Sequence, residues 1–327
     1  MNNEPRMLVL AGPTAVGKSA VALVLAERLG GEIVAVDSMQ VYRGLDIGTG
    51  KPTAEERARA PHHLIDVVEV SQPFDAGQFA RLAGEAVAAI RGRGRIAILC
   101  GGTGLYFKAL LEGLGAAPPA DAALRAALAA APLPELLREL AERDPATYER
   151  IDRQNARRVI RALEVIRLTG RPFSEQRAPW EREGASAERR CIFLGLERAP
   201  GELRRRIDGR VEEMFRRGLV AETERLLQQG LGQNPTARQA LGYRQVIEYL
   251  GGQRSLPETI ELVRIRTRQL AKRQMTWFRR QMRLRWVRLE GEPAAEAIAE
   301  RLAGEWGVPG AGGASEKALP ETGARAS

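Results

Sequence analysis

A glycine-rich loop near the start of the chain constrains the fold more than any other segment. Residues 12–19 read GPTAVGKS and match the pattern G-x-x-x-x-G-K-S, in which backbone N–H groups wrap a phosphate. An apolar run at residues 7–11 precedes the loop, and residues 20–29, which are rich in helix formers, follow it. Strand, loop and helix therefore occur in the order that a phosphate site needs. In such a site Lys18 supplies a mobile cation and the Ser19 hydroxyl can ligate Mg²⁺.

Two more short apolar runs are typical of strands that are buried on both faces. Residues 32–36 lead into Asp37, and residues 95–100 lead into two glycines and Thr103. Because ligands bind beyond the carboxyl ends of the strands in an open α/β sheet, we expect Asp37 and Thr103 beside the phosphate loop. These elements predict an α/β fold in which a parallel sheet of the P-loop NTPase type is flanked by helices.

The position of Asp37 is compatible with several roles. An acid beside a phosphate loop could complete the shell of a magnesium ion, accept a hydrogen bond from a ribose hydroxyl, or act as a general base. It could also cap a helix and face solvent. In ATP-driven motors the strand that partners the loop usually ends in an acidic residue, and here it ends in glycines, which argues against a motor. Thr103 fits a loop that positions a substrate better than it fits a plain turn.

Composition excludes several classes of protein. The chain has 327 residues and is 44% hydrophobic, enough for a packed core and about two domains. No apolar run approaches the ~20 residues of a membrane span, and the loop starts too early to leave room for a signal peptide, so we expect a soluble, cytoplasmic protein. The only cysteines, Cys100 and Cys191, cannot build a disulfide framework. The adjacent His62 and His63 make a poor chelating pair, which favours a structural role for both.

Basic residues are concentrated in the second half of the chain. Residues 1–150 contain 16 basic and 18 acidic side chains, whereas residues 151–327 contain 34 and 23. Within that half, residues 262–289 carry ten basic side chains and no acid, with Trp277 and Phe278 interleaved. A salt-bridged face normally includes acids, and basic side chains with aromatic ones suit an RNA backbone with unstacked bases. The segment therefore predicts contact with nucleic acid.

Two further groups of arginines have competing interpretations. Arg157 and Arg158, near the start of a predicted helix over residues 152–170, either contact nucleic acid or form a solvated face. Arg206 and Arg210 share a face of a predicted helix and could clamp a diphosphate. Pairing with acids close to them in sequence is the simpler interpretation. These acids are Asp208, Glu212 and Glu213.

The chain divides at a change of composition. Alanine and proline dominate between residues 113 and 134, and a strand of the buried type returns at residues 191–196. We therefore expect a core formed by residues 1–115 and 191–306, with an inserted, mostly helical domain at residues 116–190 that contacts RNA. The Gly/Ala-rich tail at residues 307–327 is expected to be disordered.

Taken in order, the motifs resemble those of the tRNA dimethylallyltransferase family. The matching segments are GPTAVGKS at 12–19, DSMQVY at 37–42, GTGKP at 48–52, HHLID at 62–66, GGTGLY at 101–106, DRQN at 152–155, RALEV at 161–165, QALGYR at 239–244 and TRQLAKRQMTWFR at 267–279. They cover most of the chain. One departure is Gly50, where the family commonly has alanine, and we expect its effect to be minor.

The resemblance implies transfer of a dimethylallyl group from dimethylallyl diphosphate to N6 of an adenosine in tRNA. The target lies next to the anticodon on its 3′ side, in tRNAs that read codons beginning with U. The phosphate loop would hold the diphosphate of the donor instead of ATP, with Mg²⁺ as cofactor and Ser19 as its ligand. Asp37 would take the proton from the amine, and Lys18 and Thr103 complete the expected catalytic set. The implied partners are dimethylallyl diphosphate and the anticodon stem-loop of tRNA, and the protein is expected to act as a monomer.

Further residues are assigned to the two binding sites. The expected donor site comprises Gly12, Pro13, Thr14, Ala15, Val16, Gly17, Lys18, Ser19 and Arg206. The expected tRNA site comprises Asp37, Ser38, Met39, Gln40, Thr103, Arg125, Gln154, Asn155, Ala156, Arg157, Arg158, Gln239, Ala240, Leu241, Gly242, Tyr243, Arg244, Lys272, Arg273, Gln274, Met275, Thr276, Trp277, Phe278 and Arg279. Two rival functions stay open. One is a kinase or nucleotide-hydrolysing RNA-binding enzyme, whose loop would prefer ATP, and the other is a non-catalytic RNA-binding module with a vestigial loop.

Overall fold

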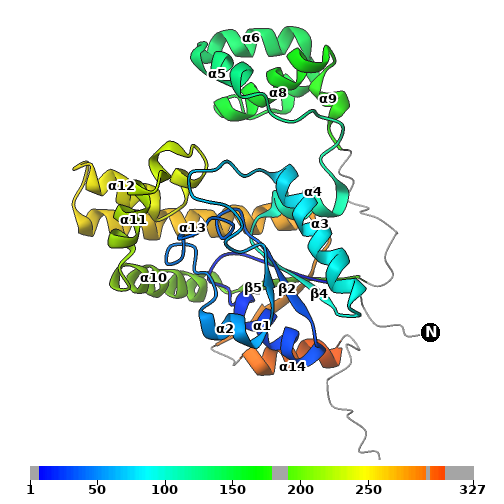
Figure 1. The fold of residues 1–327 in the computed structure, drawn as a ribbon, viewed down its shortest axis with the longest axis vertical. Coiled ribbons are helices and arrows are strands. Elements are labelled where there is room, and N and C mark those ends of the chain that lie inside the picture. Colours follow the sequence, from blue (N-terminus) through cyan, green and yellow to red (C-terminus); the bar gives the residue numbers. More distant parts are fainter. Residues whose placement is uncertain (1–6, 179–190, 292–294, 306–327) are drawn as a thin grey trace, which may run out of the picture. The chain divides into compact units, whose positions relative to one another are not determined.

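The computed structural model describes residues 7–178, 191–291 and 295–305, so the tail expected to be disordered lies outside the described residues (Figure 1). The strands are β1 (Met7–Ala11), β2 (Glu32–Val36), β3 (His62–His63), β4 (Ala97–Gly101), β5 (Cys191–Arg198) and β6 (Arg285–Leu289).

Helices make up most of the rest of the described chain. They are α1 (Lys18–Leu29), α2 (Ala54–Arg59), α3 (Ala76–Gly92), α4 (Gly104–Glu112), α5 (Ala122–Ala130), α6 (Leu133–Arg143), α7 (Pro145–Arg150), α8 (Ala156–Thr169), α9 (Phe173–Gln176), α10 (Pro200–Arg216), α11 (Leu219–Gln228), α12 (Tyr243–Leu250), α13 (Leu256–Gln281) and α14 (Ala295–Glu305). Two short 3₁₀ turns, η1 (Leu231–Gln233) and η2 (Ala237–Gln239), precede α12.

The strands form one sheet in the order β3-β2-β4-β1-β5-β6, and every neighbouring pair is parallel. β1 lies between β4 and β5: Met7 pairs with Ala97 on one side and Cys191 on the other. All residues of β1 and β2 are buried, as expected for strands covered by helices on both faces. The predicted parallel α/β sheet is confirmed. Its arrangement brings the carboxyl ends of β1, β2 and β4 to the same edge.

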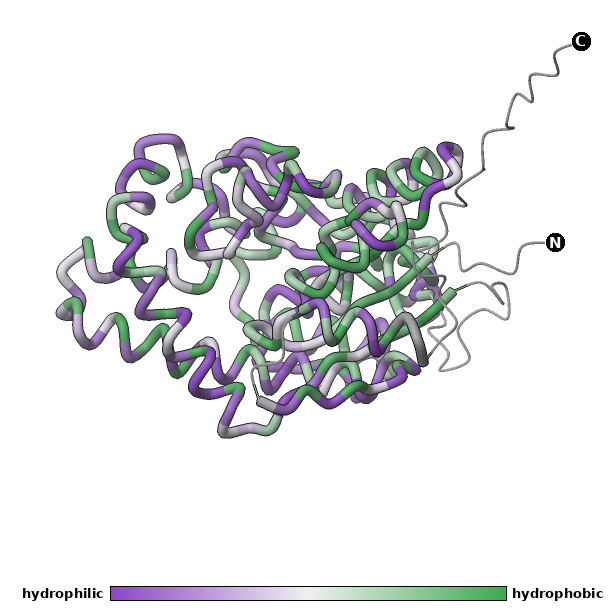
Figure 2. Tube along the Cα trace, turned by 90° about the horizontal axis from the view of Figure 1, so that it is seen from below, coloured by the Kyte–Doolittle hydropathy of each residue, from purple (hydrophilic) through white to green (hydrophobic). Residues whose placement is uncertain are grey.

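The core of the sheet is apolar and continuous with the helices beside it. Leu8 and Leu10 of β1 pack with Val24 of α1 and with Ile298 of α14. Hydrophobic and hydrophilic residues alternate within the turns of the helices, which is the pattern of helices with one buried face (Figure 2). None of the described helices has the length and the apolar character that a membrane span needs.

Helix α13 is long and firmly anchored. A capping box formed by Ser255 and Glu258 starts it, and its Val263 and Ala271 pack in an apolar cluster with α10. This anchoring matters because α13 carries most of the basic segment found in the sequence.

The chain forms two compact units. The first contains the sheet and comprises Met1–Pro73, Glu85–Gly102 and Glu188–Ser327; the second comprises Phe74–Gly84 and Thr103–Ala187. The second unit thus begins before the expected boundary at residue 116 and also takes in the first part of α3. It has its own core, in which Leu128, Leu140 and Leu163 are buried.

Candidate active site

The phosphate loop joins β1 to α1 and has a backbone that requires its glycines. Gly12 and Gly17 have positive φ angles of 152° and 110°. A Cβ on Gly12 would lie 2.6 Å from the carbonyl oxygen of Leu196 in β5, so a side chain there would collide with the neighbouring strand. Gly17 caps α1 in the left-handed conformation, which places the loop at the positive end of that helix.

Cationic side chains hold the carbonyl groups of this loop. Lys18 Nζ donates to the carbonyl of Pro13 at 2.7 Å, Arg206 Nε to that of Ala15 at 2.9 Å, and Arg198 Nε to that of Val16 at 3.0 Å. Arg198 ends β5 and Arg206 lies on α10, so both come from the far half of the sequence. Positive charge is thereby gathered around a loop whose carbonyl groups are already occupied, an arrangement suited to an anion.

A cavity of about 520 Å³ opens beside the loop. Its walls come from the start of α1, the carboxyl ends of β2 and β4, the segment after β2, and helices α10 and α13. The side chains in its wall that carry chemistry are Lys18, Ser19, Asp37, Arg206, Arg210 and Gln274. The structure therefore brings together the Lys18, Ser19, Asp37 and Arg206 that the sequence had pointed to.

Asp37 directly follows β2 and is held in a fixed orientation. Its Oδ1 accepts hydrogen bonds from the backbone N–H groups of Met39 at 2.8 Å and Gln40 at 3.2 Å. The carboxylate therefore caps a tight turn, not a helix, and still lines the cavity. Gln40 extends the arrangement, since its Nε2 donates to the carbonyls of Thr49 and Gly50 at 3.3 Å each.

Arg210 completes the wall opposite the loop. Its Nη2 donates to the carbonyl of Thr49 at 3.1 Å, and burial lowers the pKa of the guanidinium, an effect that the charge of Asp37 opposes. Gly50 makes room for it: at a φ of 60°, a Cβ on this residue would lie 2.5 Å from Arg210 Nη2. An alanine at position 50 would displace only the tip of Arg210, a flexible side chain, and would have to adopt a backbone conformation that glycine adopts more easily.

The simpler interpretation, pairing with nearby acids, is wrong for Arg210, which forms no ion pair with any described residue. Each of these acids pairs with another arginine: Asp208 with Arg268 at 2.5 Å, Glu212 with Arg264 at 2.5 Å, and Glu213 with Arg216 at 2.7 Å. Residues four apart on α10 share a face, and that face turns to the cavity while the acids turn to α13 and to solvent. Arg206 and Arg210 thus remain oriented toward the cavity.

Burial changes the protonation of two groups in the cavity wall. It lowers the pKa of Lys18 to about 8, although nearby Cys100 and Asp37 favour the charged form. It raises the pKa of the Cys100 thiol to about 11, so this thiol stays neutral and is a poor nucleophile. Lys18 is consequently charged at neutral pH but loses its proton far more readily than an exposed lysine.

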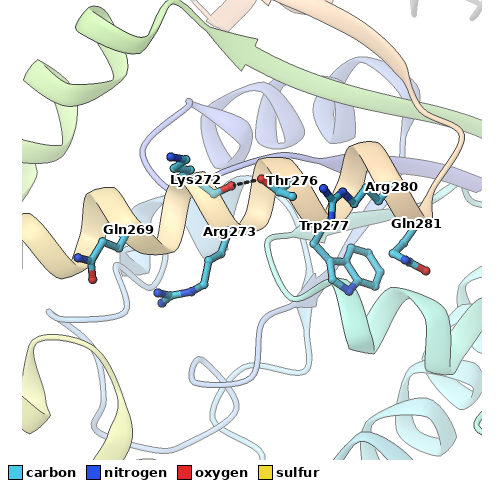
Figure 3. A pocket seen from close by; sticks show the side chains of 7 residues that line it. All are labelled: Gln269, Lys272, Arg273, Thr276, Trp277, Arg280 and Gln281. Atoms are coloured by element: carbon cyan, nitrogen blue, oxygen red, sulfur yellow. Dashed lines mark hydrogen bonds between the residues drawn. The ribbon is translucent and has the colours of Figure 1, made fainter. Parts of the chain in front are cut away.

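A second cavity, of about 490 Å³, lies along α13 and has a different character (Figure 3). It is lined by Gln269, Lys272, Arg273, Thr276, Trp277, Arg280 and Gln281. Figure 3 shows Gln269, Arg273, Trp277 and Gln281 projecting from one side of the helix at four-residue spacing. Cations next to an indole ring suit a nucleic-acid backbone with an unstacked base.

The acid-free appearance of this segment in the sequence does not hold in space. Arg264 and Arg268 pair with the acids of α10, and Arg279 Nη2 pairs with Glu197 of β5 at 2.6 Å. Lys272 and Arg273, in contrast, form no ion pair with any residue that the structure describes. The acids thus neutralise the first half of α13 and leave the part around residues 272–273 positively charged.

Several residues expected to contact tRNA have buried side chains. The side chains of Ala240, Tyr243 and Phe278 are at most 2% exposed, and the backbone of Gly242 is buried too. Tyr243 has an internal role: its hydroxyl donates to Glu222 at 2.5 Å and accepts from the N–H of Gly48 at 3.0 Å. These motif positions hold the fold together and present no side chain to RNA.

The segment after β2 is fixed by further buried groups, of which Glu222 lies outside the sequence motifs quoted above. Glu222 of α11 accepts from the N–H of Ile47 at 3.0 Å, and Lys51 donates to Asp46 at 2.7 Å and Asp66 at 2.5 Å. Burial and the charge of Glu222 raise the pKa of Tyr243. The histidines face elsewhere, since His63 Nε2 bonds Glu32 at 2.7 Å and His62 Nδ1 bonds the carbonyl of Ala60 at 2.8 Å.

In the second unit most of the expected tRNA-binding positions are exposed. Gln154, Ala156, Arg157 and Arg158 are exposed at the start of α8, whereas the Asn155 side chain caps that helix by accepting from the N–H of Arg158 at 3.3 Å. Arg125 of α5 is exposed and pairs with Glu164 at 3.0 Å. Thr103 begins the longer segment of this unit and is the N-cap of α4. In the first unit, Arg244 and Gln239 bond each other at 3.1 Å, and Arg244 is exposed.

Comparison with known proteins agrees with these features. The sequence model of the family described as IPP transferase matches residues 40–281. The chain is 47% identical over 288 residues to tRNA dimethylallyltransferase 1 of Trichlorobacter lovleyi, covering 87% of this chain and 94% of that one. It is 42% identical over 306 residues to the tRNA dimethylallyltransferase of Pelotomaculum thermopropionicum, covering 92% and 96%.

Solved structures show the same likeness. The full-length tRNA isopentenylpyrophosphate transferase from Bacillus halodurans is similar, with a TM-score of 0.66 and 36% identity, covering 92% of this chain and 97% of that one. A eukaryotic dimethylallyltransferase acting on tRNA gives a TM-score of 0.74 at 26% identity, covering 94% and 81%. With a family match over most of its length and close relatives along nearly all of it, the chain belongs to the IPP transferase family.

Proposed function

We propose that this protein transfers a dimethylallyl group from dimethylallyl diphosphate to tRNA. The observation that carries the proposal is the 520 Å³ cavity, in which a phosphate loop and an oriented carboxylate, Asp37, share one wall. The family membership and the names of the relatives support the same reaction. At the finer level, we propose that the acceptor is N6 of the adenosine on the 3′ side of the anticodon, in tRNAs that read codons beginning with U.

The donor fits the cationic side of the cavity. We infer that its diphosphate lies against the phosphate loop, with Lys18, Arg206 and Arg210 around it. These cations would stabilise the charge that develops on the diphosphate as the allylic C–O bond breaks. Arginine forks suit the spread-out charge of a diphosphate, and the single lysine supplies a compact charge close to the leaving oxygen.

The donor set beside the loop suits a magnesium ion carried mainly by the substrate. Among the described residues no cluster of three or more histidine, cysteine or acidic side chains could hold a metal. The Ser19 hydroxyl lines the cavity beside Lys18, and one protein ligand is enough for Mg²⁺ when phosphate oxygens and waters supply the others. Bound in this way, Mg²⁺ would neutralise the diphosphate, and Ser19 is the residue that would hold it.

Asp37 would act on the acceptor. The N6 amine of adenine is a weak nucleophile because its lone pair is delocalised into the ring. As the nitrogen forms its bond to the allylic carbon and the diphosphate leaves, the surplus proton on nitrogen would pass to the Asp37 carboxylate. The turn that anchors Oδ1 keeps this carboxylate aimed at the cavity without help from the substrate.

RNA binding would use the exposed cations described above. Arg273 and Lys272 of α13 would meet the phosphate backbone, and Trp277 offers a stacking surface for an unpaired base. The target base must leave its stack to reach a cavity of this kind, which favours a flexible anticodon loop over a duplex. We also propose that the protein works as a monomer, because one chain supplies both cavities. We place its activity in the cytoplasm.

A transfer assay tests the proposed function directly. Radiolabelled dimethylallyl diphosphate and unmodified tRNA should yield labelled tRNA without ATP. Asp37→Asn keeps the turn but loses the base, so kcat should fall by about 10²- to 10⁴-fold while tRNA binding changes little. Asp75→Asn is the matched control, because Asp75 Oδ1 likewise accepts from the backbone N–H groups two and three residues on, Gly77 and Gln78 at the start of α3, and Asp75 does not line the cavity. Strict dependence on ATP, or equal losses of binding and turnover in Asp37→Asn, would contradict the proposal.

A further inference from the structure

Gln274 lies on α13 but its side chain points into the donor cavity, not onto the RNA-facing surface. Its Oε1 accepts a hydrogen bond from the backbone N–H of Thr14 at 2.8 Å, and its Nε2 donates to the carbonyl of Gly102 at 3.0 Å. Thr14 belongs to the phosphate loop and Gly102 follows β4. One amide therefore connects α13 to both loops that line the donor cavity.

The bond to Thr14 fixes a particular peptide plane. The N–H of Thr14 and the carbonyl of Pro13 belong to the same planar peptide group. That carbonyl accepts from Lys18 Nζ at 2.7 Å, so the plane is held by Gln274 at one end and by Lys18 at the other. Release of the Gln274 end would let this peptide rotate and would remove the fixed acceptor that aims the Lys18 ammonium.

Glutamine suits this position better than other side chains of its size. It offers one acceptor and one donor, whereas glutamate cannot donate to Gly102 and methionine can do neither. The absence of a side chain on Gly102 is part of the fit, because a Cβ there would lie 2.4 Å from Gln274 Nε2. The second cavity is instead lined by the two residues that precede Gln274, Lys272 and Arg273.

We propose that Gln274 is a positioning residue for the donor site: it fixes the phosphate loop against α13 and acts on the reaction through Lys18. This inference rests on the proposed function and replaces the tRNA contact that the sequence assigned to this position. It also gives α13 two roles, since one side of the helix meets RNA and Gln274 on another side orders the donor loop. The capping box and the buried Phe278 keep the helix rigid enough to serve both.

The test compares Gln274→Met with Gln269→Met, a matched change on the same helix in the RNA-facing cavity. For Gln274→Met we expect the KM for dimethylallyl diphosphate to rise about tenfold or more, with the Kd for tRNA within about twofold of wild type. Gln269→Met should leave the donor KM unchanged.

A second measurement needs no turnover. Titration of the protein with inorganic pyrophosphate and Mg²⁺, followed by calorimetry, should show about tenfold weaker binding for Gln274→Met and for Gln274→Glu. Weakened tRNA binding with unchanged pyrophosphate binding would show that Gln274 contacts RNA and would overturn the inference. Equal losses in every measurement, together with a lower Tm, would reduce its role to folding and would also overturn it.

These outcomes separate the inference from the proposed function. If wild-type protein fails to prenylate tRNA but binds pyrophosphate in a manner that depends on Gln274, the proposed reaction is wrong and the positioning role stands. If transfer occurs but pyrophosphate binding does not depend on Gln274, the proposed reaction stands and the positioning role is wrong.

Discussion

Raising the pH from 7 to 9 should reduce kcat/KM for dimethylallyl diphosphate about tenfold, because Lys18 loses its positive charge over this range. Burial lowers the pKa of Lys18 from 10.5 to about 8. About nine-tenths of the free protein therefore carries the Lys18 charge at pH 7, and about one-tenth at pH 9. Because kcat/KM reports ionisations of the free enzyme, its value for dimethylallyl diphosphate should fall on a limb centred near pH 8. At saturating donor the limb of kcat should lie at higher pH, since a bound diphosphate favours the ammonium.

The assay is the initial rate at low donor and saturating tRNA, measured from pH 6.5 to 9.5. Lys18→Arg keeps its charge over this range, so it should have lower activity but no alkaline limb. Lys272→Arg, the same exchange on the RNA-facing part of α13, should retain the limb. A wild-type profile that stays flat to pH 9.5, or a limb that persists in Lys18→Arg, would refute the reasoning.

The deprotonation of Lys18 does not destabilise the fold, so unfolding caused by it cannot explain the expected fall in kcat/KM. The folded protein holds the Lys18 proton less tightly than the unfolded chain, so between about pH 8 and 10.5 the unfolded state binds more protons. The contribution of Lys18 to stability therefore rises across that range as the pH rises. The Tm recorded at each pH separates other sources of instability from the loss of charge.

Two further predictions concern stability and RNA binding. Tyr243→Phe removes the hydroxyl shared by a buried glutamate and a loop N–H, and should lower the free energy of unfolding by about 2–4 kcal/mol in urea titrations. The control is Tyr249→Phe, because the hydroxyl of Tyr249 bonds to none of the described residues; its free energy of unfolding should stay within about 0.5 kcal/mol of wild type. Similar losses in both variants would refute the stabilising role of the buried Tyr243–Glu222 hydrogen bond. Arg273→Ala should weaken tRNA binding and reduce the slope of log K against log salt by about one. The control is the double variant Asp208→Asn with Arg268→Gln, which removes one charge of each sign and should leave that slope unchanged. If the slope decreases equally in the double variant and in Arg273→Ala, the ion pair does not shield Arg268 from RNA.

Local sequence was sufficient for the elements whose pattern repeats within a few residues. The apolar runs at residues 7–11 and 32–36 became β1 and β2, and the helix predicted over residues 152–170 became α8 at Ala156–Thr169. The two-residue strand β3 is too short to show any period, and it forms only because Ile33 and Val34 of β2 offer an edge to it. The membership of residues 74–84 in the second unit has the same origin, since it depends on contacts such as the stacking of Phe79 on Tyr106 at 4.2 Å.

The site follows the same division. The phosphate loop and Asp37 could be predicted because their chemistry lies in consecutive residues and in the order of strands. Which group pairs with a charged side chain depends on tertiary neighbours. Arg268 bonds Asp208, which lies sixty positions away in the sequence, and no spacing rule links Arg198 to the carbonyl of Val16. A motif also cannot distinguish a residue that touches the substrate from one that supports it, which is why Tyr243 was assigned to RNA.

The order of strands in the sheet has a consequence for synthesis of the protein. β1 leaves the ribosome before its partner β5, which is the first strand after the second unit. Until residues 191–198 emerge, one edge of a wholly apolar strand has no partner, and such edges recruit other chains. The second unit, with its own apolar core, can fold during this interval. Chains that stall or are truncated within it would expose the unpaired edge of β1 and would be prone to aggregate.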